Sequence, residues 1–214
     1  MLSLEKFEKK ECRAQIKEIE EKIWLDIFHA RRSQALNDIF LERLRKAWGA
    51  DFNRSLPMIY AISNAAIDSV VIALGRLLKP TAKNKECTLA IYQARVISYL
   101  DKYGPVLSES SHAKDSLKKL KDKSFVRQLR KRQEAFEKQI MPWRNKRTAH
   151  SETGPPPAFP KNLSMVITYV ENVHKICYSV MEDAGGPGLY STESFEKVSD
   201  YWCKCLAHLP QFTS

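Results

Sequence analysis

Positions 141–157, MPWRNKRTAHSETGPPP, combine a basic cluster with a histidine just before a run of prolines. Three residues here could together handle a phosphodiester: Arg144, Asn145 and His150. Histidine can accept or donate a proton near neutral pH, because its unperturbed pKa lies close to that pH. Arginine stays charged and can hold two phosphate oxygens at once, and an asparagine amide donates a hydrogen bond without competing for protons. These types suit metal-free RNA cleavage, in which the ribose 2′-hydroxyl attacks the neighbouring phosphate, and DNA lacks that hydroxyl.

The spacing of these residues limits how one chain could assemble the site. On an unbroken helix Arg144 and His150 would point about 120° apart, whereas Arg147 and His150 would share one side. A bend at Pro142 could bring the first pair together, or a second chain could supply the missing partner. One histidine per chain also falls short of a separate acid and base, and a two-fold dimer would supply two. The spacing therefore predicts a composite site in a homodimer.

The same cluster has a simpler structural interpretation. Arginines and a histidine near the C-terminus of a helix stabilise the helix dipole without any catalytic role. The residues alone leave both interpretations open.

The net charge of +10 is concentrated in one part of the chain. Thirteen basic and four acidic residues lie between positions 114 and 147, so this segment carries +9. Such asymmetry is typical of proteins that bind polyanions, although a run of charge can also be a solvated helix face. The residues expected to contact an RNA backbone are Lys146, Arg147, Arg127, Arg130 and Lys131.

The stretch Arg144-Asn145-Lys146-Arg147-Thr148-Ala149-His150 resembles the signature of the HEPN superfamily: an arginine, a polar residue, and a histidine after a short gap. The chain looks most similar to the AbiU-type abortive-infection proteins, whose motif reads R-[ND]-K-x-x-A-H near the end of a long helix. An earlier apolar helix in that branch ends in L-x-R-L, and Leu74-Gly75-Arg76-Leu77 is similar to it.

This resemblance implies a helical bundle that dimerises with two motifs facing each other. It also implies a metal-independent endoribonuclease that leaves a 2′,3′-cyclic phosphate, in phage defence or as the toxin of a toxin–antitoxin pair, with a possible antitoxin or regulatory partner. Arg144 would bind the phosphate, Asn145 would position it and His150 would transfer protons. One subfamily has a tyrosine two residues after the histidine, where this chain has Glu152, so the resemblance does not extend to regulation through that tyrosine.

Two polar residues of an earlier apolar segment are further candidates. Asn64 and Asp68 lie four residues apart, and on a helix they would share a face from which they could support Arg144 or His150. The alternative is a polar pair that is hydrogen-bonded inside the bundle.

Apolar residues recur at helical spacing and nowhere alternate for long, which predicts an all-α antiparallel bundle of about five to seven helices. We expect one domain spanning residues 1–214. Positions 4–48 contain no Gly or Pro and predict one long helix or two helices joined by a bend. Further helices are expected over 57–78, over 86–103, in the basic segment, over 162–181 and from about 192 to 209.

Caps and breaks can be predicted for some of these helices. Ser124 is a candidate cap for the basic helix and Asn162 for the next one. Pro142 should break or kink the basic helix. Within that helix the predicted apolar stripe consists of Phe125, Leu129, Phe136 and Ile140.

The apolar segment 57–79 is about as long as a membrane span. It contains Asn64, Asp68 and Arg76, and unpaired charge is costly in hydrocarbon, so we interpret it as a buried central helix and expect no membrane partner. The N-terminus is charged from its fifth residue and shows no signal peptide, which favours a cytoplasmic protein.

The five cysteines have no framework spacing and fit reduced thiols. Cys203 and Cys205 lie near His174 and His208 in the sequence, but residues two apart on a helix point about 200° apart and chelate poorly. We therefore expect no metal and no cofactor. Apart from His150, the histidines are expected to be structural or exposed.

Two other functions fit the same sequence. The first is a non-catalytic module of the same fold that binds RNA, a nucleotide or a protein. The second is a structural helical partner whose basic face meets an acidic protein.

Overall fold

The computed structural model describes residues 2–48, 56–79, 87–104, 111–148 and 162–181. These residues form six helices and no strands, which confirms the predicted all-α fold. The helices are α1 (Leu2–Trp48), α2 (Leu56–Leu77), α3 (Leu89–Tyr103), α4 (Ser111–Lys121), α5 (Lys123–Thr148) and α6 (Leu163–Tyr178). The helix predicted from about 192 to 209 lies outside the described residues.

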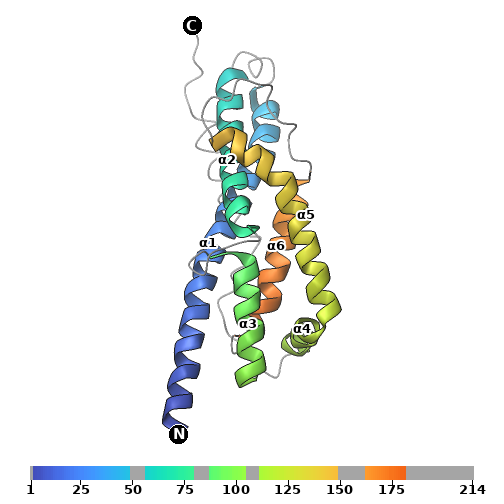
Figure 1. Cartoon of the computed structure of the whole chain (residues 1–214). Coiled ribbons are helices and arrows are strands. Elements are labelled where there is room, and N and C mark those ends of the chain that lie inside the picture. Colours follow the sequence, from blue (N-terminus) through green and yellow to red (C-terminus); the bar gives the residue numbers. More distant parts are fainter. Residues whose placement is uncertain (1, 49–55, 80–86, 105–110, 149–161, 182–214) are drawn as a thin grey trace.

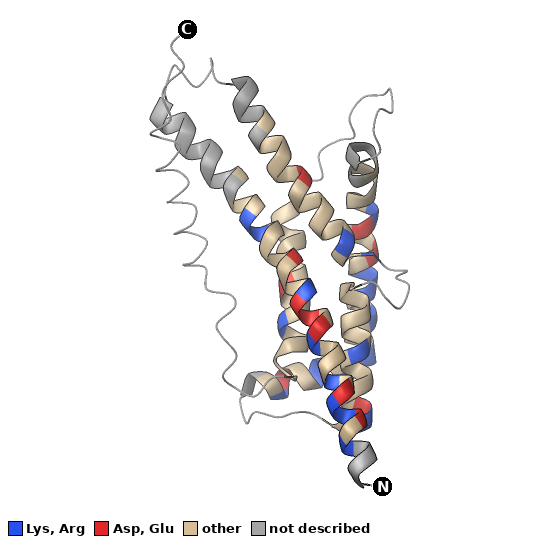
Figure 2. Ribbon diagram, turned by 90° about the vertical axis from the view of Figure 1, so that its left-hand side faces the viewer, with Lys and Arg blue, Asp and Glu red and all other residues tan. Residues whose placement is uncertain are grey.

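The N-terminal segment forms one continuous helix of 47 residues, which decides between the two arrangements that the sequence left open. At 1.5 Å per residue α1 is about 70 Å long, and α2 returns beside it (Figure 1). Ile16, Ile23 and Ile27 are buried at the predicted helical spacing. Lysines and arginines lie beside acidic residues along α1 (Figure 2), so the charge on this helix is mixed.

The most apolar helix, α2, contacts α1, α5 and α6. Its buried residues include Val70, Leu74 and Leu77, which are spaced by four and three positions and share one face. This face of α2 is buried as predicted, whereas Asn64, Ile72 and Arg76 are exposed. None of the helices in the described part of the chain is long and apolar enough to cross a bilayer.

Helix α3 begins and ends with well-defined caps. The Thr88 hydroxyl accepts a hydrogen bond from the Ile91 N–H at 3.3 Å. Gly104 has φ +73° and donates its N–H to the carbonyl of Leu100 at 3.0 Å, and glycine adopts this left-handed conformation without strain. The helix therefore starts at residue 89, later than the sequence predicted.

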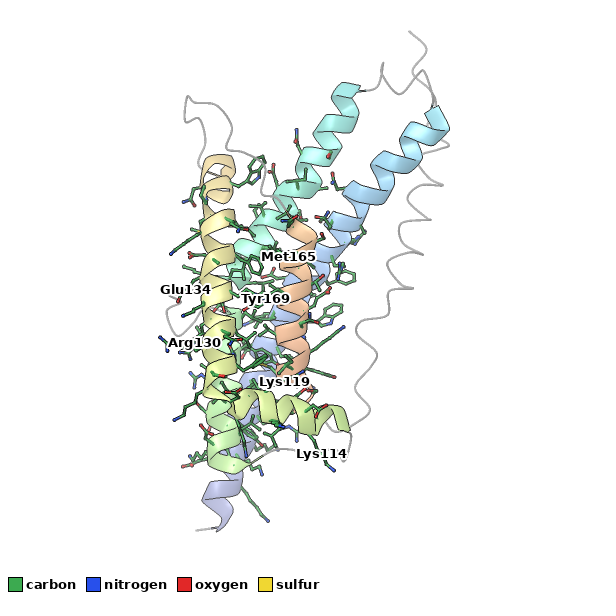
Figure 3. All side chains as sticks on the ribbon, turned by 90° about the vertical axis from the view of Figure 1, so that its right-hand side faces the viewer. Lys114, Lys119, Arg130, Glu134, Met165 and Tyr169 are labelled. Atoms are coloured by element: carbon green, nitrogen blue, oxygen red, sulfur yellow. The ribbon has the colours of Figure 1, made fainter. Side chains whose placement is uncertain are left out.

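The basic segment forms two helices rather than one, separated at Asp122. The Asp122 carboxylate accepts a hydrogen bond from the Ser124 N–H at 2.8 Å, and hydrogen bonds from Ser124 and Phe125 lower the pKa of Asp122. Asp122, not Ser124, therefore caps α5, and the prediction for Ser124 was wrong. Helix α4 lies across the end of α6 at a steep angle (Figure 3).

Asn162 occupies the predicted cap position of α6, but its side chain makes no capping hydrogen bond. The residue instead has φ +67°, in the left-handed region that asparagine tolerates better than most residues. The sequence predicted the position of the cap correctly, but the side-chain hydrogen bond expected of a capping asparagine is absent.

Polar side chains link the helices at several points in the described part of the chain. Arg31 Nε of α1 donates to Glu171 Oε1 of α6 at 2.8 Å, in a partly buried ion pair. A more exposed pair links Arg76 Nε of α2 to Asp26 Oδ2 of α1 at 3.1 Å. The Tyr169 hydroxyl of α6 donates to a backbone carbonyl of α5 at 2.6 Å.

Candidate nucleic-acid interface

The candidate catalytic motif begins in the last turns of α5. Arg144, Asn145, Lys146 and Arg147 all have helical backbone, and Asn145 is exposed. The side chains of the three basic residues and the whole of His150 lie outside the described part of the chain. The composite site therefore stays a prediction.

Helix α5 continues through Pro142, so the predicted break does not occur. Proline removes one hydrogen bond of the helix and crowds the preceding turn, which bends the axis. In Figure 1 the last turns of α5 point toward α2, consistent with the predicted kink. Ile140 and Trp143 on either side of the proline are buried, so the turn that carries the motif is anchored in the core.

The predicted concentration of positive charge is distributed over the exposed faces of α4 and α5. Every lysine and arginine of these two helices whose side chain is described is exposed, and none of these forms an ion pair within the described part of the chain. Three acidic residues on the same helices, together with Asp122 between them, leave an excess of six positive charges there. The basic surface consists of Lys114, Lys118, Lys119, Lys121, Lys123, Arg127, Arg130, Lys131, Arg132 and Lys138.

Part of this surface is in register with the motif. Arg127, Lys131, Lys138 and Asn145 follow one another at spacings of four, seven and seven residues, and all four are exposed. On a regular helix Arg127, Lys131 and Lys138 fall within about 40° of one another around the axis, and Asn145 follows beyond the bend at Pro142. We call this row the outer face of α5, and it leads along the helix to the first residues of the motif.

A shallow hollow of about 420 Å³ lies at the start of the outer face. Lys123, Arg127 and Lys131 border it, together with Gln128 and Ser124. The sequence singled out Arg127 and Lys131 but missed Lys123 and Gln128. The four-residue spacing of the three cations was the signal that could have identified Lys123.

The position of Arg130 is also as expected for a solvent-facing residue. In Figure 3 Arg130 and Glu134 project from the side of α5 that faces away from α6. Glu134 is the acidic residue closest in sequence to this part of the surface, so it partly offsets the positive potential near Arg130.

The two candidate supporting residues lie on α2, as predicted. Asn64 is exposed and Asp68 is partly buried. Because the side chains of Arg144 and His150 are not described, the support that Asn64 and Asp68 would give them stays a prediction.

The side chains of two other histidines are described, and neither belongs to the basic surface. His29 is exposed on α1. His174 of α6 has no exposed surface and stacks between Tyr92 and Tyr178, with ring centroids 5.5 and 5.9 Å away. Burial, with a smaller contribution from Lys175, lowers the pKa of His174 to about 4. The prediction that these two histidines are structural or exposed is confirmed.

The described cysteines are reduced thiols. Cys12 and Cys87 are partly buried, and Cys177 is buried. Burial raises the pKa of the Cys177 thiol to about 12, so this thiol stays protonated and unreactive near neutral pH. No group of three or more potential metal ligands occurs among the described residues, and Cys203 and Cys205 lie beyond them.

Comparisons with known proteins identify no relative: no family model, no curated protein and no solved structure matches the chain.

Proposed function

We propose that the chain binds RNA along the outer face of α5 and cleaves it as a metal-independent endoribonuclease of the HEPN type. One observation carries this proposal: exposed cations without ion-pair partners in the described part of the chain form a row that leads to Asn145. From Arg127 to Asn145 the row is about 27 Å long at 1.5 Å per residue. A single strand bound along it would present its backbone to the turn that begins the motif.

In this proposal Arg144 binds the scissile phosphate and stabilises the charge that develops on it. Asn145 donates a hydrogen bond that positions the same phosphate. His150 transfers the protons, and a homodimer supplies a second histidine so that one acts as base and the other as acid. Such an enzyme would act in the cytoplasm, in phage defence or as a toxin held in check by a partner.

Cleavage is tested by incubating the purified chain with a 5′-labelled single-stranded RNA in EDTA and identifying the new ends. We expect fragments that end in a 2′,3′-cyclic phosphate. His150→Ala should slow cleavage by about 100-fold or more, because positioned proton transfer contributes roughly 10²–10⁴-fold to rate. His29→Ala, which removes an exposed histidine of α1, is the matched control and should cleave at the wild-type rate. Equal activity of the His150 variant, or activity that disappears in EDTA, would contradict the mechanism.

Binding is tested separately with the catalytically silent His150→Ala chain. The affinity for single-stranded RNA should fall with salt, with a slope of log Kd against log salt that reflects the number of phosphates contacted. Replacing Arg127, Lys131 and Lys138 together with alanine should reduce this slope by about 2, since each contact contributes about 0.7. A control triple variant of α1, Lys6→Ala, Lys9→Ala and Lys10→Ala, removes the same charge from a helix of mixed sign.

The alternative function is a binding module of the same fold without catalysis. It rests on the basic surface alone, whose ten cations need no catalytic motif to hold a polyanion. RNA binding with the expected salt dependence but no cyclic-phosphate products would select this alternative. If the control triple variant of α1 reduced the salt slope as much as the outer-face variant, both the ribonuclease and the binding-module proposals would be contradicted.

A further inference from the structure

A groove runs between α5 and α6 and is closed at one end by α4. Its volume is about 770 Å³, and α4, α5 and α6 all contribute side chains to it. Figure 3 looks onto this side of the molecule, where Met165 and Tyr169 of α6 and Lys119 of α4 are labelled. The groove lies on the side of α5 that faces α6, so it is separate from the outer face.

The walls of the groove repeat with helical spacing. On α5 the lining residues include Phe125, Leu129 and Phe136, which span eleven positions, and on α6 the lining runs from Met165 to Ile176, which spans the same number. Eleven residues correspond to about three turns, or about 16 Å. A groove of this length between two helices matches the apolar side of a third helix about three turns long.

The floor of the groove contains apolar surface that water can reach. Met165 is 53% exposed, one of four large apolar side chains that are exposed in the described part of the chain. Phe125 and Ile176 are only partly buried. Methionine adapts its shape to different partners and is common where helices dock. Exposed apolar surface that lines a groove with polar edges is typical of interaction sites.

The edges of the groove are positively charged. Lys119 and Arg132 are exposed and form no ion pair within the described part of the chain, and Lys175 adds a third cation. Asp115 is the acidic residue among the described residues of the lining. The edge therefore has an excess of two positive charges and is complementary to a partner with acidic flanks.

From this combination we propose that the groove binds an amphipathic helix of a partner protein, with apolar side chains facing the floor and Asp or Glu facing Lys119, Arg132 and Lys175. RNA fits this site less well. The rings at its centre, Phe136 and Tyr169, pack against each other with centroids 5.2 Å apart and are only 6% and 7% exposed, so they offer no open face on which a base could stack.

The docked helix and RNA would use different sides of α5. Residues two positions apart on a helix point about 200° apart, and Arg127 and Lys131 each lie two positions from an apolar residue of the groove, Phe125 and Leu129 respectively. The groove proposal can therefore be tested independently of the proposed ribonuclease activity.

The test uses the full-length protein and three fluorescein-labelled peptides of about 18 residues, roughly five helical turns. The first carries leucines at helical spacing with glutamates beside them. The second replaces the glutamates with lysines, and the third has the composition of the first in scrambled order. Fluorescence anisotropy should show micromolar binding of the first peptide and at least tenfold weaker binding of the other two. Equal binding of the acidic and basic peptides, or no binding of the acidic peptide, would overturn the proposal.

Variants locate the bound peptide. Met165→Glu should weaken binding at least tenfold, and Lys119→Glu combined with Arg132→Glu should reverse the preference toward the basic peptide. The matched control is Leu25→Glu on α1, since Leu25 is 51% exposed and lies outside the groove, and it should change binding less than twofold. If circular dichroism shows that Met165→Glu is unfolded, Lys175→Glu replaces it as the single variant and should weaken binding about threefold or more.

RNA binding is measured in parallel on the same variants. We expect Met165→Glu to leave RNA affinity unchanged and Arg127→Ala with Lys131→Ala to leave peptide affinity within about threefold of wild type. Loss of RNA affinity in Met165→Glu, together with displacement of the peptide by single-stranded RNA, would assign the groove to RNA and overturn the proposal.

Discussion

Replacing His174 with phenylalanine should reduce the loss in free energy of unfolding that the protein suffers when the pH is lowered. His174 has no exposed surface and lies between the rings of Tyr92 and Tyr178. Burial disfavours the charged imidazolium, and Lys175 disfavours it further. The folded protein therefore keeps this histidine neutral at pH values where an unfolded chain would protonate it.

The magnitude follows from the two pKa values. The pKa of His174 is about 4 in the folded protein, against 6.5 for an unperturbed histidine. Between these values the unfolded state binds a proton that the folded state does not, so the free energy of unfolding falls as the pH falls. The full difference corresponds to about 3 kcal/mol, of which about 2 kcal/mol is lost at pH 5 and almost none at pH 8. The free energy of unfolding is therefore unaffected by His174 above its unfolded pKa and falls as the pH drops below that value.

The assay is urea denaturation followed by circular dichroism, at about pH 8 and about pH 5. Wild type should lose about 2 kcal/mol more on acidification than His174→Phe or His174→Gln. Phenylalanine preserves the flat ring between the tyrosines and glutamine preserves hydrogen bonding, so agreement between the two variants isolates the charge. His29→Phe, at an exposed histidine, should behave like wild type. If acidification costs wild type and both His174 variants the same free energy, the argument from burial is refuted.

Urea denaturation at pH 7 tests three further predictions. Glu171→Gln, in the partly buried ion pair with α1, should lower the free energy of unfolding by about 2 kcal/mol, whereas Asp26→Asn in the more exposed pair should cost at most about 1 kcal/mol. Tyr169→Phe removes a hydroxyl that bonds a backbone carbonyl and should cost about 1 kcal/mol. Tyr99→Phe removes a buried hydroxyl with no hydrogen-bond partner among the described residues, so it should be neutral or stabilising. Gly104→Ala should cost about 1 kcal/mol because φ is +73° there. If Glu171→Gln and Asp26→Asn cost the same free energy, burial does not strengthen the first ion pair. If Tyr169→Phe and Tyr99→Phe cost the same, the hydrogen bond of Tyr169 does not contribute to stability.

The helices could be predicted because their signals are local. Positions 4–48 lack Gly and Pro and place isoleucines at helical spacing, and α1 is continuous through them. The apolar stripe of the basic helix was also predicted correctly, since Leu129, Phe136 and Ile140 are buried and Phe125 is partly buried. These features depend only on the period of the helix.

The break between α4 and α5 was missed because neither Gly nor Pro marks it. The signal was Asp122 itself, a good N-cap residue two positions before the predicted cap Ser124, with lysines on either side of it. The sequence also contains a local signal for the burial of His174. It follows Val166, Val170 and Val173 at spacings of four, three and one, on the face of α6 that enters the core.

The groove could not be predicted from any single stretch of sequence. Met165 directly precedes the buried Val166, yet it is 53% exposed. The groove depends on how α4, α5 and α6 pack against one another, since all three helices contribute to its lining. Such an arrangement is set by contacts between distant segments and has no local signature.

The arrangement of charge around α5 changes what the net charge of the segment implies for RNA binding. If all thirteen basic residues of positions 114–147 contacted phosphates, single-stranded RNA would bind with a salt slope of about −9. Lys119 and Arg132 belong to that count but border the groove, on a different side of the structure from Arg127 and Lys131. A backbone that follows the outer face cannot contact both groups along one straight path. The number of cations in the segment is therefore an upper limit, and the residues that share a helix face determine how many phosphates one strand can meet.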